Sequence, residues 1–198
     1  MMDYIQIEVQ EAILSHVRIP NQREPKVKGV LTMIPEIIEK RKIILIGMDF
    51  FGNPLKRIGI LSGQNEIGLL WKRFNDFYQT KKGSMKHLVS ESGYEVWIHL
   101  ENERDSKNKY VFVGVEVEQI EDLPLELVAK ILPETRYAVF TLKGREFKAG
   151  VSKMIWDKWL PEAGLNTSFD FMIEYHDRKR FRGLDNPDSE LDLMVPIL

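Results

Sequence analysis

The stretch FDFMIEYHD, residues 169–177, has the alternating pattern of a β-strand with one buried face. Successive side chains of a strand point to opposite faces, so Phe171, Ile173 and Tyr175 share a face that is typical of a protein core. Met172 and Glu174 lie on the other face. The alternation therefore predicts that Glu174 points into a cleft, and the alternative is that it is an ordinary solvated strand residue.

The order of elements around this strand occurs twice in the chain. The first half contains an expected strand at 42–52, a helix at 65–79, and strands at 93–100 and 109–120; the second half contains a strand at 135–144, a helix at 147–160, and strands at 167–176 and 189–197. This repetition indicates two related halves, about 35–120 and 133–198, joined by a linker at 121–133. Residues 1–34 are expected to hold a separate amphipathic helix at 3–17 and a polar linker, so that the main domain covers 35–198.

The composition excludes several classes of protein. The chain has 198 residues, of which 43% are hydrophobic and 29% charged, and it contains no cysteine. Disulfides and thiolate metal sites are therefore absent, and a reducing cytoplasm is the expected compartment. The net charge of −2 gives no general attraction to nucleic acid or to anionic membranes. No apolar run approaches the roughly 20 residues that span a bilayer.

Metal or cofactor chemistry has little support in the sequence. The four histidines are scattered and lack the close spacing of zinc motifs. His99 and His176 fall in equivalent expected strands, which leaves a metal between them as a remote alternative. There is also no glycine-rich phosphate loop, so neither a metal nor a cofactor is expected.

Each expected strand has one aliphatic face that can pack under the helices and one face that mixes aromatic side chains with carboxylates. We expect the mixed faces to meet in one cleft, because aromatic groups with a few polar groups are typical of small-molecule sites. The alternatives are a solvated strand position for the carboxylates and a gap-filling role for the methionines. Trp71 and Trp156, within the helices, are expected to pack in the core. The candidate ligand-binding residues are Trp97, Phe112, Glu116, Tyr137, Met172, Glu174 and Met194.

Four segments of the second half occur in a characteristic order: RYAVFTLKG, WDKWLPEAGL, FMIEYHD and SELDLMVPI. Together they resemble the GyrI-like family, also called the AraC-type effector-binding domain, and the first half is similar to the weaker N-terminal repeat of that family. The resemblance covers about residues 35–198. It implies an α+β fold in which tandem βαββ units are related by pseudo-two-fold symmetry, with a ligand cleft between them.

The resemblance also implies a choice of functions. Many members of the family are sensor domains of transcription activators, and they bind hydrophobic cations through aromatic side chains and a buried carboxylate. Others stand alone and sequester drugs or protect gyrase, and some hydrolyse cyclopropane-bearing genotoxic compounds with a glutamate. Residues 1–34 are too few for a DNA-binding unit, so direct DNA binding is not expected. A protein partner such as gyrase or a regulator is a further alternative.

Two hypotheses follow for the cleft. In the first, the protein binds amphipathic, cationic aromatic molecules: Trp97, Phe112 and Tyr137 provide stacking and cation–π attraction, and Glu174, with Glu116, provides the countercharge. In the second, the protein is a hydrolase in which Glu174 or Glu116 activates a water molecule beside a strained ring while Trp97 holds the substrate. Both hypotheses use the same residues, so the sequence leaves the choice between them open.

Overall fold

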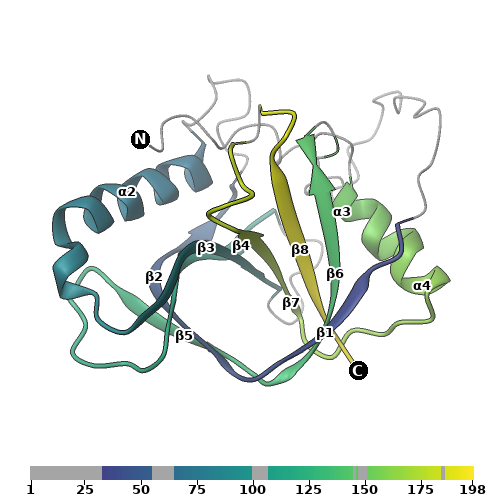
Figure 1. Ribbon diagram of the computed structural model, residues 1–198, viewed down its shortest axis with the longest axis horizontal. Helices are drawn as coiled ribbons and strands as arrows, with labels where there is room; N and C mark the ends of the chain where they lie inside the picture. The colour runs from purple at the N-terminus through teal and green to yellow at the C-terminus, as the bar shows by residue number, and fades with distance from the viewer. Residues whose placement is uncertain (1–32, 55–64, 100–106, 145, 147–150, 184–185) are drawn as a thin grey trace.

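The computed structural model describes residues 33–54, 65–99, 107–144, 146, 151–183 and 186–198. Within these residues, eight strands form one antiparallel sheet in the order β1-β6-β8-β7-β3-β4-β2-β5 (Figure 1). The strands are β1 (Glu36–Lys40), β2 (Ile43–Gly52), β3 (Leu88–Ile98), β4 (Lys109–Val117), β5 (Val128–Leu132), β6 (Thr135–Lys143), β7 (Phe171–His176) and β8 (Glu190–Ile197). The expected helix at 3–17 lies outside the described residues.

Helix α2 (Glu66–Lys81) confirms the helix that its apolar spacing predicts, and the short 3-10 helix η2 (Lys82–Ser84) follows it. Asn65 caps α2, because its side-chain oxygen accepts a hydrogen bond of 2.7 Å from the backbone N–H of Gly68. The buried residues of α2 form one stripe that packs over β2 and β4. This stripe places Trp71 above the middle of the sheet.

The second helical segment contains α3 (Val151–Met154), a π-helical turn η4 (Ile155–Trp159) and α4 (Leu160–Glu162). Pro161 lies within α4, at the end of this continuous helical segment. The segment ends before Gly164, whose φ of +67° suits glycine. The N–H of Leu165 then donates to the carbonyl of Leu160.

The two ends of the sheet are joined by a long two-stranded ribbon. Strand β1 runs into β2, and β5 runs into β6, with only two residues between the strands of each pair. Lys40 pairs with Thr135 in the β1–β6 ladder, and Ile43 pairs with Leu132 in the β2–β5 ladder, so the register continues without a shift. The segment 121–133 was expected to be a linker, but it contributes β5 to this ribbon.

Because the ribbon joins its ends, the sheet has two buried faces. The helix-side face packs against α2 and η4 through residues such as Trp71, Ile155 and Trp159. On the opposite face the sheet closes on itself, and a second core forms there from strands alone. This second core contains Ile43, Leu45, Tyr94, Val96, Phe112, Leu132, Tyr137, Val139, Phe171, Ile173 and Met194.

Gly47 of β2 and Gly114 of β4 are directly paired in the antiparallel ladder of these two strands. A Cβ atom on Gly114 would lie 2.2 Å from the carbonyl oxygen of Ile46, and one on Gly47 would lie 2.0 Å from that of Val113. Both contacts are with backbone, which cannot move aside as a flexible side chain can. The close approach of these two strands therefore requires glycine at both positions.

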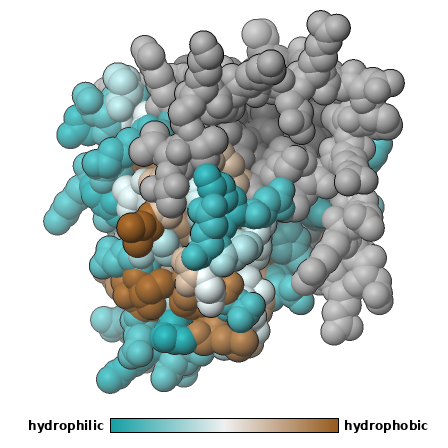
Figure 2. Space-filling model, turned by 90° about the vertical axis from the view of Figure 1, so that its right-hand side faces the viewer, coloured by the Kyte–Doolittle hydropathy of each residue, from teal (hydrophilic) through white to brown (hydrophobic). Residues whose placement is uncertain are grey.

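At the surface, apolar side chains appear in small areas bordered by polar ones. Figure 2 shows this on the side that carries β1 and α4. Ile34 and Leu198 are among the exposed apolar residues, and scattered exposure of this kind is normal for globular proteins. Among the described residues, no helix combines the length and the apolar character that are needed to cross a bilayer.

Candidate functional site

Three of the candidate residues come together on the helix-side face. Trp97 of β3 pairs directly with Met172 of β7, and Glu95 pairs directly with Glu174. Side chains paired across two strands point to the same face, and Trp97 and Met172 both belong to the helix-side core. Trp97 and Met172 therefore lie on the same face of the sheet as Glu174.

The other four candidates, Phe112, Glu116, Tyr137 and Met194, lie on the opposite face, so the prediction that all seven line one cleft is wrong. Phe112, Tyr137 and Met194 belong to the second core. The reason lies in the register: Val96, not Trp97, is the partner of Phe112.

The carboxyl group of Glu116 is also held on that opposite face. It pairs in the ladder with Leu45, a member of the second core. Its Oε2 accepts a hydrogen bond of 2.5 Å from the hydroxyl group of Tyr94. Glu116 is therefore separated from Glu174 by the sheet itself.

Sequence reasoning did not identify Glu95, whose carboxyl group accepts two hydrogen bonds from tryptophan side chains. Its Oε2 accepts a hydrogen bond of 2.5 Å from the indole N–H of Trp71, and its Oε1 accepts one of 2.8 Å from the indole N–H of Trp97. Two N–H donors on the two oxygens favour the ionised carboxylate. Trp71 was expected only to pack in the core, so its polar role was also missed; the period of two, which places Glu95 beside Trp97, was the available signal.

Glu174 and His176 present polar atoms that have no protein partner. Glu174 is 2% exposed, and its Oε1 has no hydrogen bond. The Nε2 atom of His176 is likewise buried without a partner, and it lies 4.0 Å from Oε2 of Glu174. Buried polar atoms are rarely left in this state, so this pair is a candidate position for a ligand or a bound water molecule.

Aromatic rings enclose His176 on both sides. Its ring stacks on Trp71 at a centroid distance of 5.1 Å and on Phe181 at 4.4 Å, with interplanar angles of 18° and 22°. Phe181 comes from the connection between β7 and β8. This connection therefore supplies part of the site.

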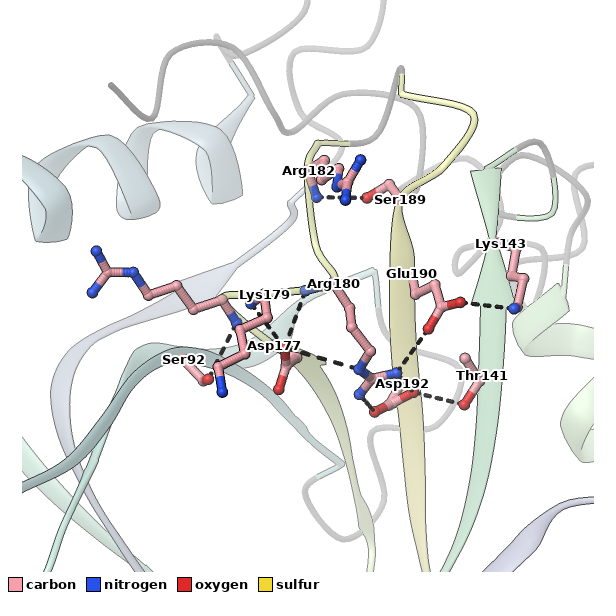
Figure 3. A network of polar contacts seen from close by, with 11 residues as sticks. Ser92, Thr141, Lys143, Asp177, Lys179, Arg180, Arg182, Ser189, Glu190 and Asp192 are labelled. Atoms are coloured by element: carbon pink, nitrogen blue, oxygen red, sulfur yellow. Dashed lines mark hydrogen bonds and ion pairs between the residues drawn. The ribbon is translucent and has the colours of Figure 1, made fainter.

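A network of polar contacts holds that connection in place (Figure 3). The guanidinium of Arg180 donates to both carboxyl oxygens of Asp192 and, at 3.1 Å, to Glu190. The backbone N–H of Arg182 donates to the hydroxyl group of Ser189 at 2.9 Å. Because these anchors lie on either side of Phe181 in the sequence, they fix the backbone from which its ring covers His176.

Burial controls the protonation of the three ionisable groups. It raises the pKa of Glu174 to about 8. Burial, together with the charge of Glu174, raises the pKa of Glu95 to about 8, while His176 and the two indole N–H groups act in the opposite direction. Burial lowers the pKa of His176 to about 4, so its ring is neutral at pH 7.

The two carboxyl groups face each other and cannot both ionise readily. Because the pKa values of Glu95 and Glu174 are both raised to about 8, both carboxyl groups are largely protonated at pH 7. Glu95, Glu174 and His176 each offer one ligand atom within 4.8 Å of the others, as in clusters that hold metal ions. The arrangement can accept a proton, a metal ion or an organic cation in an apolar surrounding.

Comparison with known proteins decides the family. Residues 36–197 match the model of the Cass2 family, which is described as integron-associated effector binding protein. The chain belongs to the GyrI-like effector-binding family. The predicted family and the α+β fold are therefore confirmed, and proteins of this family bind small molecules as effectors.

One relative of the chain is a transcriptional regulator. The transcriptional regulator BrlR of Pseudomonas aeruginosa is 32% identical over 187 residues, which are 94% of this chain and 59% of BrlR. The chain thus spans 59% of the length of that relative.

Solved structures extend the comparison at low identity. SAV2435 bound to tetraphenylphosphonium has a TM-score of 0.60 and 11% identity, over 84% of this chain and 94% of that one. A hydrolase encoded by lin2189 from Listeria innocua has a TM-score of 0.50 and 10% identity, over 83% and 91%. These two structures show the shared fold.

Proposed function

We propose that this protein binds amphipathic, cationic aromatic small molecules at the Glu95–Glu174–His176 cluster. One observation carries the proposal: Glu174 is a buried carboxyl group with an unpartnered oxygen among aromatic rings. An isolated buried charge is costly unless it is paired, and a cation supplies the pairing. The aromatic faces of Trp71, Trp97 and Phe181 add cation–π and stacking attraction.

The protonation of the site fits this role. Without a ligand, the protons on Glu95 and Glu174 keep the cluster near neutrality at pH 7. A cation replaces the proton of Glu174, so binding releases that proton to solvent. Because the pKa of Glu174 is raised to about 8, removal of the proton becomes easier as the pH rises, and the affinity for cations should increase up to that value.

Two of the comparisons support the proposal without carrying it. The printed name of SAV2435 includes tetraphenylphosphonium, a hydrophobic cation, and we extend that ligand class to this chain. BrlR is a transcriptional regulator, and we extend to this chain the role of sensing an effector. The lack of cysteine favours a cytoplasmic setting for that role.

Titration with tetraphenylphosphonium, followed by quenching of tryptophan fluorescence, tests the proposal. Glu174→Gln keeps the shape of the side chain and removes its charge, so it should weaken tetraphenylphosphonium binding by roughly 1–3 kcal/mol. The substitution should change the binding of triphenylphosphine oxide, a neutral ligand with similar rings, far less. Glu118→Gln, at an exposed position after β4, is the matched control. Equal binding of the cation by the Glu174 variant and the parent protein would overturn the proposal.

Tryptophan variants localise the signal in the same experiment. Trp97→Ala should remove much of the quenching, because Trp97 pairs with Met172 and donates to Glu95. Trp156→Ala should mainly lower stability, because Trp156 is a partly buried helix residue that makes an edge contact with His99. The reverse pattern would place the ligand beside the second helical segment.

Hydrolysis is the second candidate, and one observation favours it. A buried carboxyl group with a pKa of about 8 is suited to exchange a proton with water or substrate near neutral pH. In this case Glu174 positions and activates a water molecule beside a strained ring. Mass spectrometry of products after incubation with a cyclopropane-bearing electrophile separates the two functions. A hydrolysis product that depends on Glu174 would establish the hydrolase. Recovery of the unchanged compound would contradict the hydrolase and favour binding alone.

A further inference from the structure

We propose that the preferred ligand of this site carries a primary ammonium group on a flat apolar body, in preference to a fully substituted onium ion. This inference rests on the proposed binding of cations and adds which kind of cation fits. It is based on the geometry of the hydrogen-bond acceptor atoms of Glu95, Glu174 and His176.

The spacing of the acceptors matches one tetrahedral nitrogen with three N–H groups. One atom from each of Glu95, Glu174 and His176 lies within 4.8 Å of the other two, and Oε2 of Glu174 is 4.0 Å from Nε2 of His176. Three acceptors that each lie at hydrogen-bonding distance from one ammonium nitrogen are separated from one another by about 4.6 Å. An ammonium group at the centre of this triangle can therefore donate to all three residues.

A metal ion is the competing occupant of the same three residues. Nitrogen and oxygen ligands around tetrahedral zinc are about 3.4 Å apart, because each metal–ligand bond is short. The separation of 4.0 Å between Glu174 and His176 lies about midway between this value and that of an ammonium group. The experiments below therefore include zinc as an outcome that would overturn the inference.

The chemical state of each acceptor also fits. Each oxygen of Glu95 already accepts one indole N–H and retains a further lone pair. Oε1 of Glu174 and Nε2 of His176 have no partner, and the neutral imidazole accepts a hydrogen bond at Nε2 when its Nδ1 carries the proton. An onium ion without N–H groups would leave these acceptors unsatisfied in a dry site, which is unfavourable.

The apolar body of the ligand has a defined neighbourhood. Trp71 and Phe181 enclose His176 from its two sides, and both are flat rings against which an aromatic group can stack. Phe181 is partly exposed, and Trp71 is 8% exposed. We therefore expect the apolar body of the ligand to contact the ring of Phe181, which is the more solvent-exposed of the two rings that stack on His176.

Calorimetric titration of the whole chain with matched naphthalene ligands tests the inference. The ligands are naphthylmethylamine as the primary ammonium, its N,N,N-trimethyl analogue, and naphthylmethanol as the neutral reference. The primary ammonium should bind at least about tenfold more tightly than the trimethyl analogue, the scale of one hydrogen bond to a charged group. Equal or tighter binding of the trimethyl ion would overturn this inference while leaving cation binding intact. If neither cation binds better than naphthylmethanol, the proposed function fails as well.

His176→Phe examines the acceptor directly. The substitution keeps a ring between Trp71 and Phe181 and removes Nε2, so the preference for the primary ammonium over the trimethyl ion should decrease severalfold. An unchanged preference would show that His176 accepts no hydrogen bond from the ligand. A stoichiometric zinc complex that excludes naphthylmethylamine from the parent protein would also overturn the inference. The comparison of ligands on the parent protein stands even where the variant folds poorly.

Discussion

Glu174→Gln should make the protein more stable at neutral and mildly alkaline pH, even though it removes a group from the proposed binding site. The carboxyl group has its pKa raised by burial from 4.5 to about 8. Between these values it is ionised in the unfolded chain and protonated in the folded one. The free energy of unfolding therefore falls as the pH rises through this range. Below pH 4.5 the carboxyl group is protonated in both states, and it causes no such loss of stability.

The magnitude follows from the displacement of the pKa. Each pH unit between the two pKa values costs about 1.4 kcal/mol per carboxyl group. At pH 7, which is 2.5 pH units above the unfolded pKa, the penalty from Glu174 is therefore at most about 3.4 kcal/mol. Glutamine has no such penalty, and its substitution also removes the charge that raises the pKa of Glu95. The free energy of unfolding of the variant should thus exceed that of the parent by an amount that increases with pH.

Urea unfolding of both proteins at several pH values between 4.5 and 8 measures this difference. We expect the two unfolding free energies to be similar at the acid end and to diverge toward the alkaline end. Glu118→Gln, at its exposed position, should follow the parent throughout. A difference that is independent of pH, or a variant that is less stable than the parent at pH 8, would refute the assignment of a buried protonated carboxyl group.

Two further substitutions examine the sheet. Gly114→Ala should destabilise the protein by more than about 3 kcal/mol, or prevent folding, because its Cβ would lie 2.2 Å from the carbonyl oxygen of Ile46; circular dichroism and thermal unfolding measure the loss, and a near-parental melting temperature would contradict the close strand approach. Tyr137→Phe should leave stability unchanged or raise it by about 1 kcal/mol, because the hydroxyl group of Tyr137 is buried without a partner; a clear loss of stability in urea would mean that this hydroxyl group has a partner in solution.

The fold was largely predictable, because it rests on signals that are local in sequence. The helical spacing of apolar residues identified α2, and period-two alternation identified β6 and β8 within one or two residues. The short strand β5 was missed because VAKIL, between two prolines, is brief and largely exposed. Its pairing with β2 is a tertiary effect that a local pattern does not contain.

The site was predictable only in part, for a physical reason. Alternation separates the two faces of each strand, but it does not state which face of one strand continues onto the next. Where one face is solvated, hydrophobicity settles that question. In β3 and β7 both faces are buried, since Val96 and Ile173 fill the second core while Trp97 and Met172 fill the helix-side core.

Glu174 and Trp97 were therefore placed together correctly from neighbouring strands. Phe112 was placed with them only because it is aromatic. The contribution of Phe181 could not be predicted, because its position depends on ion pairs of Arg180 that join residues distant from it in the sequence.

The ribbon formed by β1–β2 and β5–β6 has a consequence for how the chain unfolds. One long strand consists of β1 and β2, and the other consists of β5 and β6. Each repeat therefore depends on strands outside it for part of its hydrogen bonding: β1 pairs with β6, and β5 pairs with β2. Removal of either repeat would expose a backbone edge and half of the second core at the same moment. We therefore expect the tandem repeats to unfold as a single cooperative unit, and an effector bound at the proposed site at Glu174 should raise the resistance of the entire domain to unfolding and proteolysis.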